Sequence, residues 1–329
     1  MSSDVSSRIA HALGVIGIGV LALYSGTAAA MGPLCDGNKP ATPAPDLRTV
    51  WGDPDLQGVW SGADTVGVPL DRDPKLGTRD QLTEEEFEAR RALLIKNASP
   101  NNIEATNFGA DPEVAFTRSR QASLVVDPPN GQRPPLTPEA HARPAPRHSF
   151  MRGSFDTLAD FGTFDRCIAF STIPAAQPVN TLEIVQSPGY VAIRAEVIHE
   201  ARIVPLDGSA HLSSALKSYA GDSRGHWDGR TLVVETSNFN GGTNLTGNAG
   251  ERPTDRLTVT ERFSLVDENT LSYEATINDP ETWTQPWTVA FPRIRERNGA
   301  LYEYACHEGN LGLRNILSAA RAAEKSTGK

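Results

Sequence analysis

The feature that most constrains the fold is a series of short alternating segments in the second half of the chain. From Thr181 onwards, apolar and polar residues alternate with a period of two, which is typical of β-strands with one buried face. Turn signals such as Pro188-Gly189 and Asp228-Gly229 separate these segments. The alternating segments span residues 181–186, 190–204, 231–239, 257–266, 270–278, 283–294 and 301–307.

This pattern predicts a mainly β core over residues 181–329. Seven or eight antiparallel strands joined mostly by tight turns favour an up-and-down barrel or a strongly curved sheet, of the calycin or lipocalin type. The long segment 190–204 is expected to bend and to supply two strands. Helical spacing from Leu311 to Ala323 predicts a C-terminal helix.

Residues 51–180 predict an N-terminal arm that wraps this core, because the second half of that region is long and has no steady period. The segment from Trp51 to Trp60 brackets turn residues with two tryptophans, and we expect it to cover an apolar surface. One helix is expected after Thr83, since Thr83 and Glu86 are spaced as a capping box. Arm and core together are expected to form one domain.

The first thirty residues predict a cleaved export signal. Arg8 precedes the apolar run from Leu13 to Tyr24, and residues 28–30 are alanines that suit signal peptidase. The run is short for a bilayer span, so no stable membrane anchor is expected. A Pro-rich tether follows at residues 31–50. These features predict a periplasmic or secreted protein, cleaved after Ala30.

The composition narrows the classes of function. The chain has 329 residues, 39% of them hydrophobic, which suits a globular protein with a sizeable core. A net charge of −9 without a basic run argues against a nucleic-acid partner. The chain contains no phosphate-binding glycine loop, nucleophile elbow or zinc-protease helix motif, so no nucleotide, flavin or nicotinamide cofactor is expected.

Three cysteines, Cys35, Cys167 and Cys306, allow three different single disulfides. Export would place them in an oxidising compartment. We favour the pair Cys167–Cys306, because Cys35 belongs to the Pro-rich tether and the other two flank predicted elements. Two separate buried thiols remain the alternative.

Candidate site residues are polar groups that interrupt otherwise apolar strand faces, since burying them without partners costs about 2–7 kcal/mol. They are expected to meet one another, a ligand, water or a metal. A second focus is the end of the last predicted strand, where a cysteine, an imidazole and the carboxylate of Glu308 precede the helix. The interrupting residues are His199, Asn238, Glu261, Glu303 and His307.

Three interpretations of these groups compete. They could pair internally and hold the barrel together. They could instead form an acid–base pair at a cavity, with His199 or His307 as the acid or base and Glu261 or Glu308 orienting it. Alternatively, the two histidines and one carboxylate could bind a divalent metal such as zinc, although no local ligand pair supports this.

A further polar concentration lies in the segment from Gly221 to Gly229, which is predicted to be a loop before a strand. Asp222 and Arg224 could position a substrate at the mouth of a cavity, together with Asn238 and Glu303. Equally, Asp222 and Arg224 could pair with each other and fix the loop.

Six of the segments in the mature chain resemble those of a family of exported bacterial proteins, in the same order. The resemblance implies a single folded unit from Trp51 to the terminal helix, and it supplies no catalytic residue. The segment around Cys167 departs from the family pattern Arg-Cys-Leu-Pro/Trp-Gly. The six segments are residues 51–60, 123–131, 184–191, 221–227, 279–287 and 302–310.

From these observations we expect an exported protein that acts on a small, fairly apolar molecule. The leading hypothesis is cofactor-independent acid–base chemistry, as in a lyase, isomerase or hydrolase. The alternative is a binding protein of the same fold without turnover. A purely structural envelope protein is disfavoured, because the chain lacks repeats and low-complexity tracts.

Overall fold

A computed structural model describes residues 46–97, 119–143, 148–149, 152–153, 155–169, 180–242, 245, 253–297 and 299–327. Residues from Pro40 onwards form one compact unit. The predicted export signal and nearly all of the predicted tether lie outside the described residues. No described helix is long and apolar enough to cross a membrane.

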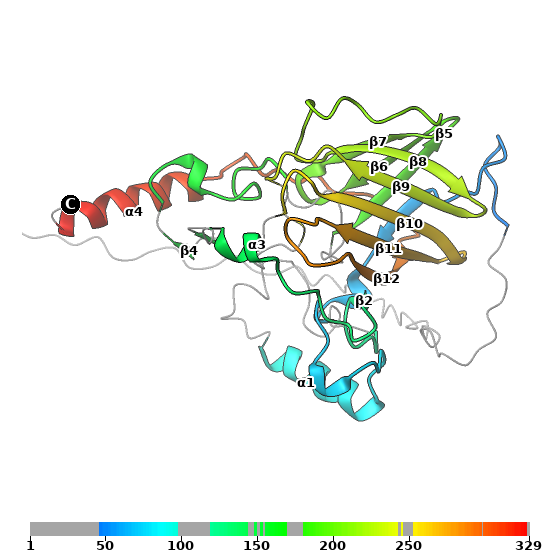
Figure 1. The fold of residues 1–329 in the computed structure, drawn as a ribbon, viewed down its shortest axis with the longest axis horizontal. Coiled ribbons are helices and arrows are strands. Elements are labelled where there is room, and N and C mark those ends of the chain that lie inside the picture. Colours follow the sequence, from blue (N-terminus) through cyan, green and yellow to red (C-terminus); the bar gives the residue numbers. More distant parts are fainter. Residues whose placement is uncertain are drawn as a thin grey trace, which may run out of the picture. The chain divides into compact units, whose positions relative to one another are not determined.

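The core is a mainly β structure, a nearly closed antiparallel barrel (Figure 1). Its neighbouring strands follow the order β7-β6-β5-β1-β12-β11-β10-β9-β8, with the short β2 (Val125–Asp127) pairing beside β12. This confirms the predicted fold class. The nine strands of the barrel are β1 (Gly58–Ser61), β5 (Leu182–Ser187), β6 (Tyr190–Ala195), β7 (Ala201–Pro205), β8 (Asp222–Asp228), β9 (Thr231–Ser237), β10 (Thr258–Asp267), β11 (Thr270–Asn278) and β12 (Trp287–Arg295).

Three segments differ from the prediction. The segment from Trp51 to Trp60 contributes strand β1. This strand lies between β5 and β12 and pairs with both of them. The segment from Gly221 to Gly229, expected to be a loop, is mostly strand β8. Residues 301–307 are not a strand, so the last predicted strand is wrong.

The barrel closes without backbone pairing between its two edges. Nine successively antiparallel strands place β7 and β8 at the ends of the path, running in the same direction. No backbone ladder joins these two edges among the described strands. They nevertheless pack closely, because a Cβ at Gly225 of β8 would come within 2.7 Å of the side chains of Val204 and Leu206. Residues 206–221 connect the two edges.

Inward-facing apolar side chains line the barrel. Strands β9 to β12 supply most of the fully buried residues, with the rings of Phe263, Tyr273 and Phe291 in successive contact at 5.1 Å between centroids. Trp60 and Trp287 are also fully buried. The alternation of the sequence thus places the core where the strand pattern predicts it.

The described helices lie outside the sheet. Helix α1 (Glu84–Asn97) begins at the predicted capping box, in which Glu86 N donates to Thr83 Oγ1 at 3.2 Å and Thr83 N donates to the Glu86 carboxylate at 2.9 Å. A short helix α3 (Pro138–Ala142) is capped by Thr137. Helix α4 (Gly312–Thr327) is the predicted C-terminal helix. The remaining short strands are β3 (His148–Ser149) and β4 (Arg152–Gly153).

The disulfide is confirmed. Cys167 and Cys306 are joined, with their Cα atoms 5.8 Å apart and a sequence separation of 139 residues. Asn310 Nδ2 donates to the carbonyl of Asp165 at 3.2 Å, which holds the same two segments together. The bridge therefore links the arm to the segment that precedes α4.

Candidate functional site

A group of buried polar residues lies within the apolar barrel. Arg202 of β7, Glu261 of β10, Tyr273 of β11, Arg293 of β12 and Asn180, just before β5, are all at most 5% exposed. We refer to these five residues as the buried arginine cluster. Of these five residues, only Glu261 is predicted from the sequence.

Glu261 is bound by two partners inside the barrel. Arg202 donates from Nη1 to Glu261 Oε2 at 2.5 Å and from Nη2 to Oε1 at 3.0 Å, a bidentate ion pair. The Tyr273 hydroxyl also donates to Oε1, at 3.0 Å. Arg202 additionally reaches Thr236 Oγ1 of β9 at 3.5 Å. Three strands are therefore tied to the edge strand β7.

Arg202 is inside because the chain bends before it. Ile198 adopts φ = 64° within the 3-10 turn Val197–His199, between β6 and β7. An unbroken alternation over residues 190–204 would place Ala201 and Ile203 on the same inward face as Val191 and Ile193. The bend reverses that alternation, so Arg202 and Val204 are buried while Ile203 is 60% exposed.

Backbone carbonyls and aromatic rings surround the guanidinium of Arg293. Its Nη1 donates to the carbonyls of Asn180 at 2.8 Å and Trp60 at 3.4 Å. Its guanidinium carbon lies 5.4 Å from the ring centre of Tyr273 and 5.2 Å from that of Phe291, within the range of cation–π attraction. No carboxylate pairs with Arg293 among the described residues.

Four donors of the cluster have no acceptor in the structure as described: Nε and Nη2 of Arg293, Nε of Arg202 and Nδ2 of Asn180. Nε and Nη2 of Arg293 belong to the same edge of the guanidinium, and such an edge presents two parallel N–H groups. Arg293 thus has one free edge suited to a ligand with two adjacent oxygens.

The charges of the cluster do not balance. Two guanidinium groups are buried with one carboxylate. Burial lowers the pKa of Arg293 to about 10. Burial also lowers the pKa of Arg202, but the charge and hydrogen bonds of Glu261 outweigh that effect and raise it. Burial raises the pKa of Tyr273 well above its ordinary value, so its hydroxyl stays neutral. The cluster has a net charge of one positive unit at neutral pH.

A further carboxyl group, that of Glu200, lies two residues before Arg202 and immediately before β7. It is half-buried, and burial raises its pKa to about 7, although the charge of Arg202 opposes this. Its charge therefore changes near neutral pH, unlike that of an exposed glutamate.

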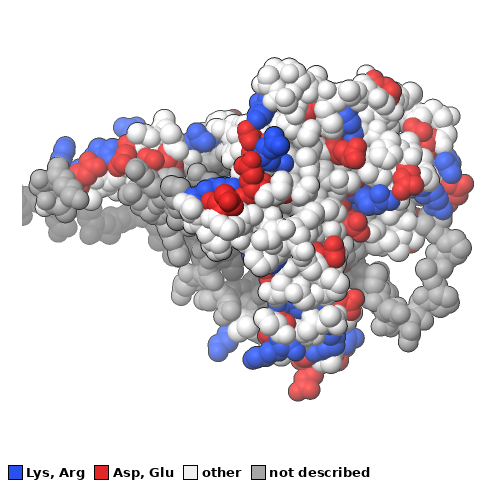
Figure 2. All heavy atoms as spheres, in the orientation of Figure 1, with Lys and Arg blue, Asp and Glu red and all other residues white. Residues whose placement is uncertain are grey.

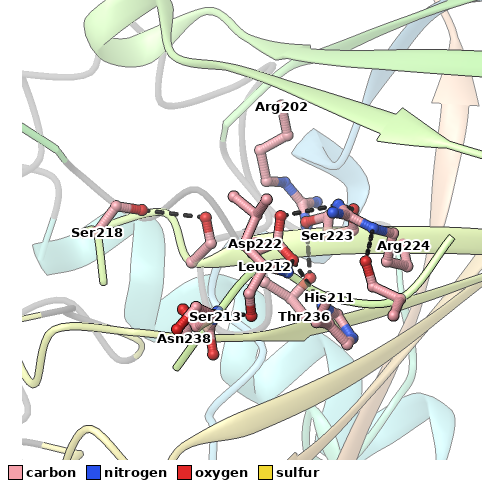
Figure 3. A network of polar contacts seen from close by, with 12 residues as sticks. Arg202, His211, Leu212, Ser213, Ser218, Asp222, Ser223, Arg224, Thr236 and Asn238 are labelled. Carbon is pink, nitrogen blue, oxygen red and sulfur yellow. Dashed lines mark hydrogen bonds and ion pairs between the residues drawn. The ribbon is translucent and has the colours of Figure 1, made fainter. Parts of the chain in front are cut away.

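A second polar network lies at the connection from β7 to β8 (Figure 3). The Asp222 carboxylate accepts from Arg224 Nη1 at 2.8 Å and from the Leu212 amide at 3.0 Å, and it contacts His211 Nδ1 at 2.8 Å. Asn238 Nδ2 donates to the Leu212 carbonyl at 3.0 Å. Asp222, Arg224 and Asn238, all predicted site residues, are therefore brought together.

This network holds the connecting segment 206–221 in place. Arg224 Nε also donates to the carbonyl of Ala210 at 3.1 Å. Burial alone would raise the pKa of Asp222, but the hydrogen bonds from Leu212 and His211, with the charge of Arg224, hold it below its ordinary value. Of the two interpretations of Asp222 and Arg224, mutual pairing is the one present.

The other predicted residues do not join Glu261. His199 is exposed in the turn between β6 and β7, and Glu303, His307 and Glu308 are exposed in the irregular segment after β12. The expected burial of His199, Glu303 and His307 on strand faces is wrong, because the bend at Ile198 and the absence of a last strand remove those faces. Glu303 and Glu308 instead line a surface depression of about 430 Å³ beside the disulfide.

Within the described ranges, no group of three or more histidine, cysteine, aspartate or glutamate side chains is arranged to hold a metal ion. His199 and His307 make no side-chain contact with a carboxylate in the described part of the chain. The zinc hypothesis for these histidines therefore gains no support from their placement.

Sequence reasoning missed Arg202, Tyr273, Arg293, Asn180 and His211. A signal was present for Arg293, which continues the apolar alternation Trp287, Val289, Phe291 by two residues. A basic side chain on an otherwise apolar strand face is as informative as the imidazoles of His199 and His307. The sequence contains no comparable signal for Arg202, because the bend at Ile198 decides whether its side chain faces the interior or the solvent.

Comparisons with known proteins add little to this geometry. No protein-family model matches the chain, and no curated protein matches it. Among solved structures, the chain is similar to a point mutant of the fluorescent protein UnaG, with 15% sequence identity and a TM-score of 0.23. That alignment covers 42% of this chain and 88% of UnaG.

Proposed function

We propose that the barrel binds a small organic molecule in its interior, with the polar end of the molecule on the buried arginine cluster. The observation that carries this proposal is the set of four buried donors without acceptors at one place in the core. The large majority of buried side-chain polar atoms in native proteins are hydrogen-bonded, so unpaired donors require an explanation. A ligand that supplies acceptors would satisfy them.

Several other buried polar groups of the barrel are paired. Gln186 accepts from the Leu56 amide at 2.7 Å and donates to the Pro54 carbonyl at 3.0 Å, and Ser223 shares a hydrogen bond with Thr236 at 2.9 Å. Outside the cluster, Arg90 Nε and the indole Nε1 groups of Trp227 and Trp287 also lack acceptors among the described residues, but each of these is a single donor rather than an edge of two parallel donors. The surrounding core is aliphatic and aromatic, which suits a ligand that is otherwise apolar.

A ligand would reach the interior most readily between strands β7 and β8. Their backbones are not hydrogen-bonded to each other, so separating them breaks side-chain contacts only. We refer to this boundary between β7 and β8 as the seam. The side chain of Arg202 crosses the seam to reach Glu261 of β10. The Asp222 network holds the adjoining segment 206–221. A ligand entering here would meet the cluster directly behind the seam.

An exported location fits this proposal. The Cys167–Cys306 disulfide is compatible with an oxidising compartment. On the face shown in Figure 2, basic and acidic side chains are interspersed, as expected for a surface that does not bind polyanions. The protein would then be an exported binding protein for a small molecule, rather than an acid–base enzyme.

A neutral fluorescent probe tests ligand binding. N-phenyl-1-naphthylamine should bind saturably, with energy transfer from the buried Trp60, Trp283 and Trp287. Replacing these three tryptophans with phenylalanine should abolish most of this transfer. Trp51→Phe is the control, because Trp51 is outside the barrel core and bonded to Asp53. Equal transfer in all variants, or no saturable binding of the probe or of any compound in a mixed small-molecule screen, would contradict the proposal.

A further inference from the structure

The unpaired donors also indicate what the ligand is, provided that the proposed binding function holds. We infer that the ligand presents a carboxylate, which the free Nε and Nη2 edge of Arg293 binds side-on inside the barrel. The cluster would thus recognise a monoanionic organic acid with an apolar body.

The first argument is the shape of the free edge. The occupied nitrogen of Arg293 is Nη1, which donates to the carbonyls of Trp60 and Asn180. These bonds fix the plane of the guanidinium and leave its other edge without a partner. Two parallel N–H groups match the two oxygens of a carboxylate, a geometry that an alcohol or an amide fills only in part.

The second argument is charge. Arg202 and Glu261 neutralise each other through their bidentate pair, and the described core holds no such partner for Arg293. A buried charge without a counter-ion is strongly disfavoured. One carboxylate would balance the cluster. A dianion would give the cluster a net negative charge and would be repelled by Glu261. A cation would add to the excess positive charge of the cluster.

The third argument is the neighbourhood of Arg293. The rings of Tyr273 and Phe291 lie close to its guanidinium, and no described polar acceptor meets its free edge. Water is scarce in such surroundings, so a charge-assisted hydrogen bond to a ligand would be worth more than on the surface. The arrangement therefore favours an acid over a neutral molecule of the same shape.

A competing explanation is purely structural. Arg293 joins β12 to the end of β1 and to the residue before β5, and the aromatic rings could compensate its charge in part. In that case the free edge would have no ligand. The two explanations differ in whether Arg293 distinguishes a carboxylate from its neutral analogue.

Isothermal titration calorimetry with matched ligands separates them. Decanoate is compared with decan-1-ol and decan-1-amine, and phenylacetate with 2-phenylethanol. We expect the wild type to bind at least one acid about 10–100-fold more tightly than its alcohol, which corresponds to about 1.4–2.8 kcal/mol. The amine should bind more weakly than the alcohol.

Three variants complete the test. Arg293→Met should remove the preference for acid over alcohol, and Arg293→Lys should retain less than about a tenth of it, because lysine keeps the charge but loses the planar edge. Arg262→Met is the matched control, since Arg262 neighbours Glu261 but pairs with Asp228 on the exposed side of the sheet. It should preserve the preference of the wild type.

The outcomes are distinct. Equal affinity for acid and alcohol in the wild type, unchanged in Arg293→Met, would overturn the carboxylate inference and leave the binding function intact. Failure of every compound to bind, including N-phenyl-1-naphthylamine, would overturn both. Should Arg293→Met lose its fold by circular dichroism, the acid-to-alcohol ratio of Arg293→Lys decides: a ratio equal to the wild type contradicts the inference.

Discussion

Arg202 and Glu261 are 59 residues apart in the chain, yet they form a bidentate ion pair at the centre of the barrel. The pair joins the edge strand β7 to β10, on the far side of β8 and β9 in the order of the sheet. Because no backbone ladder connects β7 with β8, this pair is a principal side-chain link across the seam. Because Glu261 neutralises Arg202, a ligand has to balance only the charge of Arg293.

Removing the carboxylate of this pair should be costly. Glu261→Gln keeps the size of the side chain but leaves two buried guanidinium groups without an anion. Breaking a buried ion pair typically costs about 3–5 kcal/mol. Urea unfolding should therefore show a loss of this size, whereas Glu235→Gln on the exposed side of β9 should change stability by less than about 0.5 kcal/mol. Equal stability of the two variants would show that the pair does not stabilise the barrel.

The disulfide should contribute through the long loop that it closes. Peptide mapping without reduction is expected to recover a single cross-linked pair, Cys167 with Cys306. Cys167→Ser should lower the free energy of unfolding by about 2–5 kcal/mol. Adding reductant should destabilise the wild type and leave Cys167→Ser unchanged. Recovery of both cysteines as free thiols in protein from an oxidising compartment would contradict the bridge.

Glu200 should make stability depend on pH near neutrality. Its folded-state pKa of about 7 lies above the ordinary value of 4.5, so between these values the folded protein holds a proton that the unfolded chain has lost. Stability should therefore fall as pH rises from about 4.5 through 7 and level off above, by at most about 3 kcal/mol.

Glu200→Gln tests this pH dependence. The variant should gain stability at pH 8 and flatten the profile, while at pH 4.5 it should match the wild type. Thermal melts across this range, with Glu235→Gln as the control, provide the measurement. A profile with the same slope in Glu200→Gln would assign the pH dependence to another group.

Asp222 should control the order of segment 206–221. Asp222→Ala removes the acceptor for the Leu212 amide and the partner of His211 and Arg224, at a cost of about 1–3 kcal/mol. Hydrogen exchange should accelerate in peptides from this segment. Asp228→Ala in the same strand is the control, since Asp228 is exposed and makes one surface ion pair. Similar exchange in both variants would contradict the role of Asp222.

Much of the fold could be predicted from sequence, because strand alternation, turn residues and the capping box of α1 are local signals. The strands from β9 to β11 lie within about two residues of their predicted bounds. The role of β1 was not predictable in the same way. Its position between β5 and β12 depends on pairing between segments far apart in the chain, and such pairing has no local signature.

The candidate site was harder to predict, because it depends on which side of a strand each residue faces. A single bend at Ile198 moves Arg202 inside and turns the chain after His199 to the other face. Likewise, His307 was assigned to a strand that does not form. Glu261 was predicted correctly as a buried polar residue, but its partners are arginine and tyrosine rather than histidine.

The most direct test of the account is the NMR signal of the Arg293 Nε–H group, assigned by its absence in Arg293→Lys. Titration with decanoate or phenylacetate, whichever binds more tightly, should shift this signal downfield and slow its exchange with water, because a charge-assisted hydrogen bond forms at Nε. The matching alcohol should produce a much smaller shift. If the acid binds with saturation while the Arg293 Nε–H signal stays unchanged, Arg293 is not the recognition group and the account is wrong.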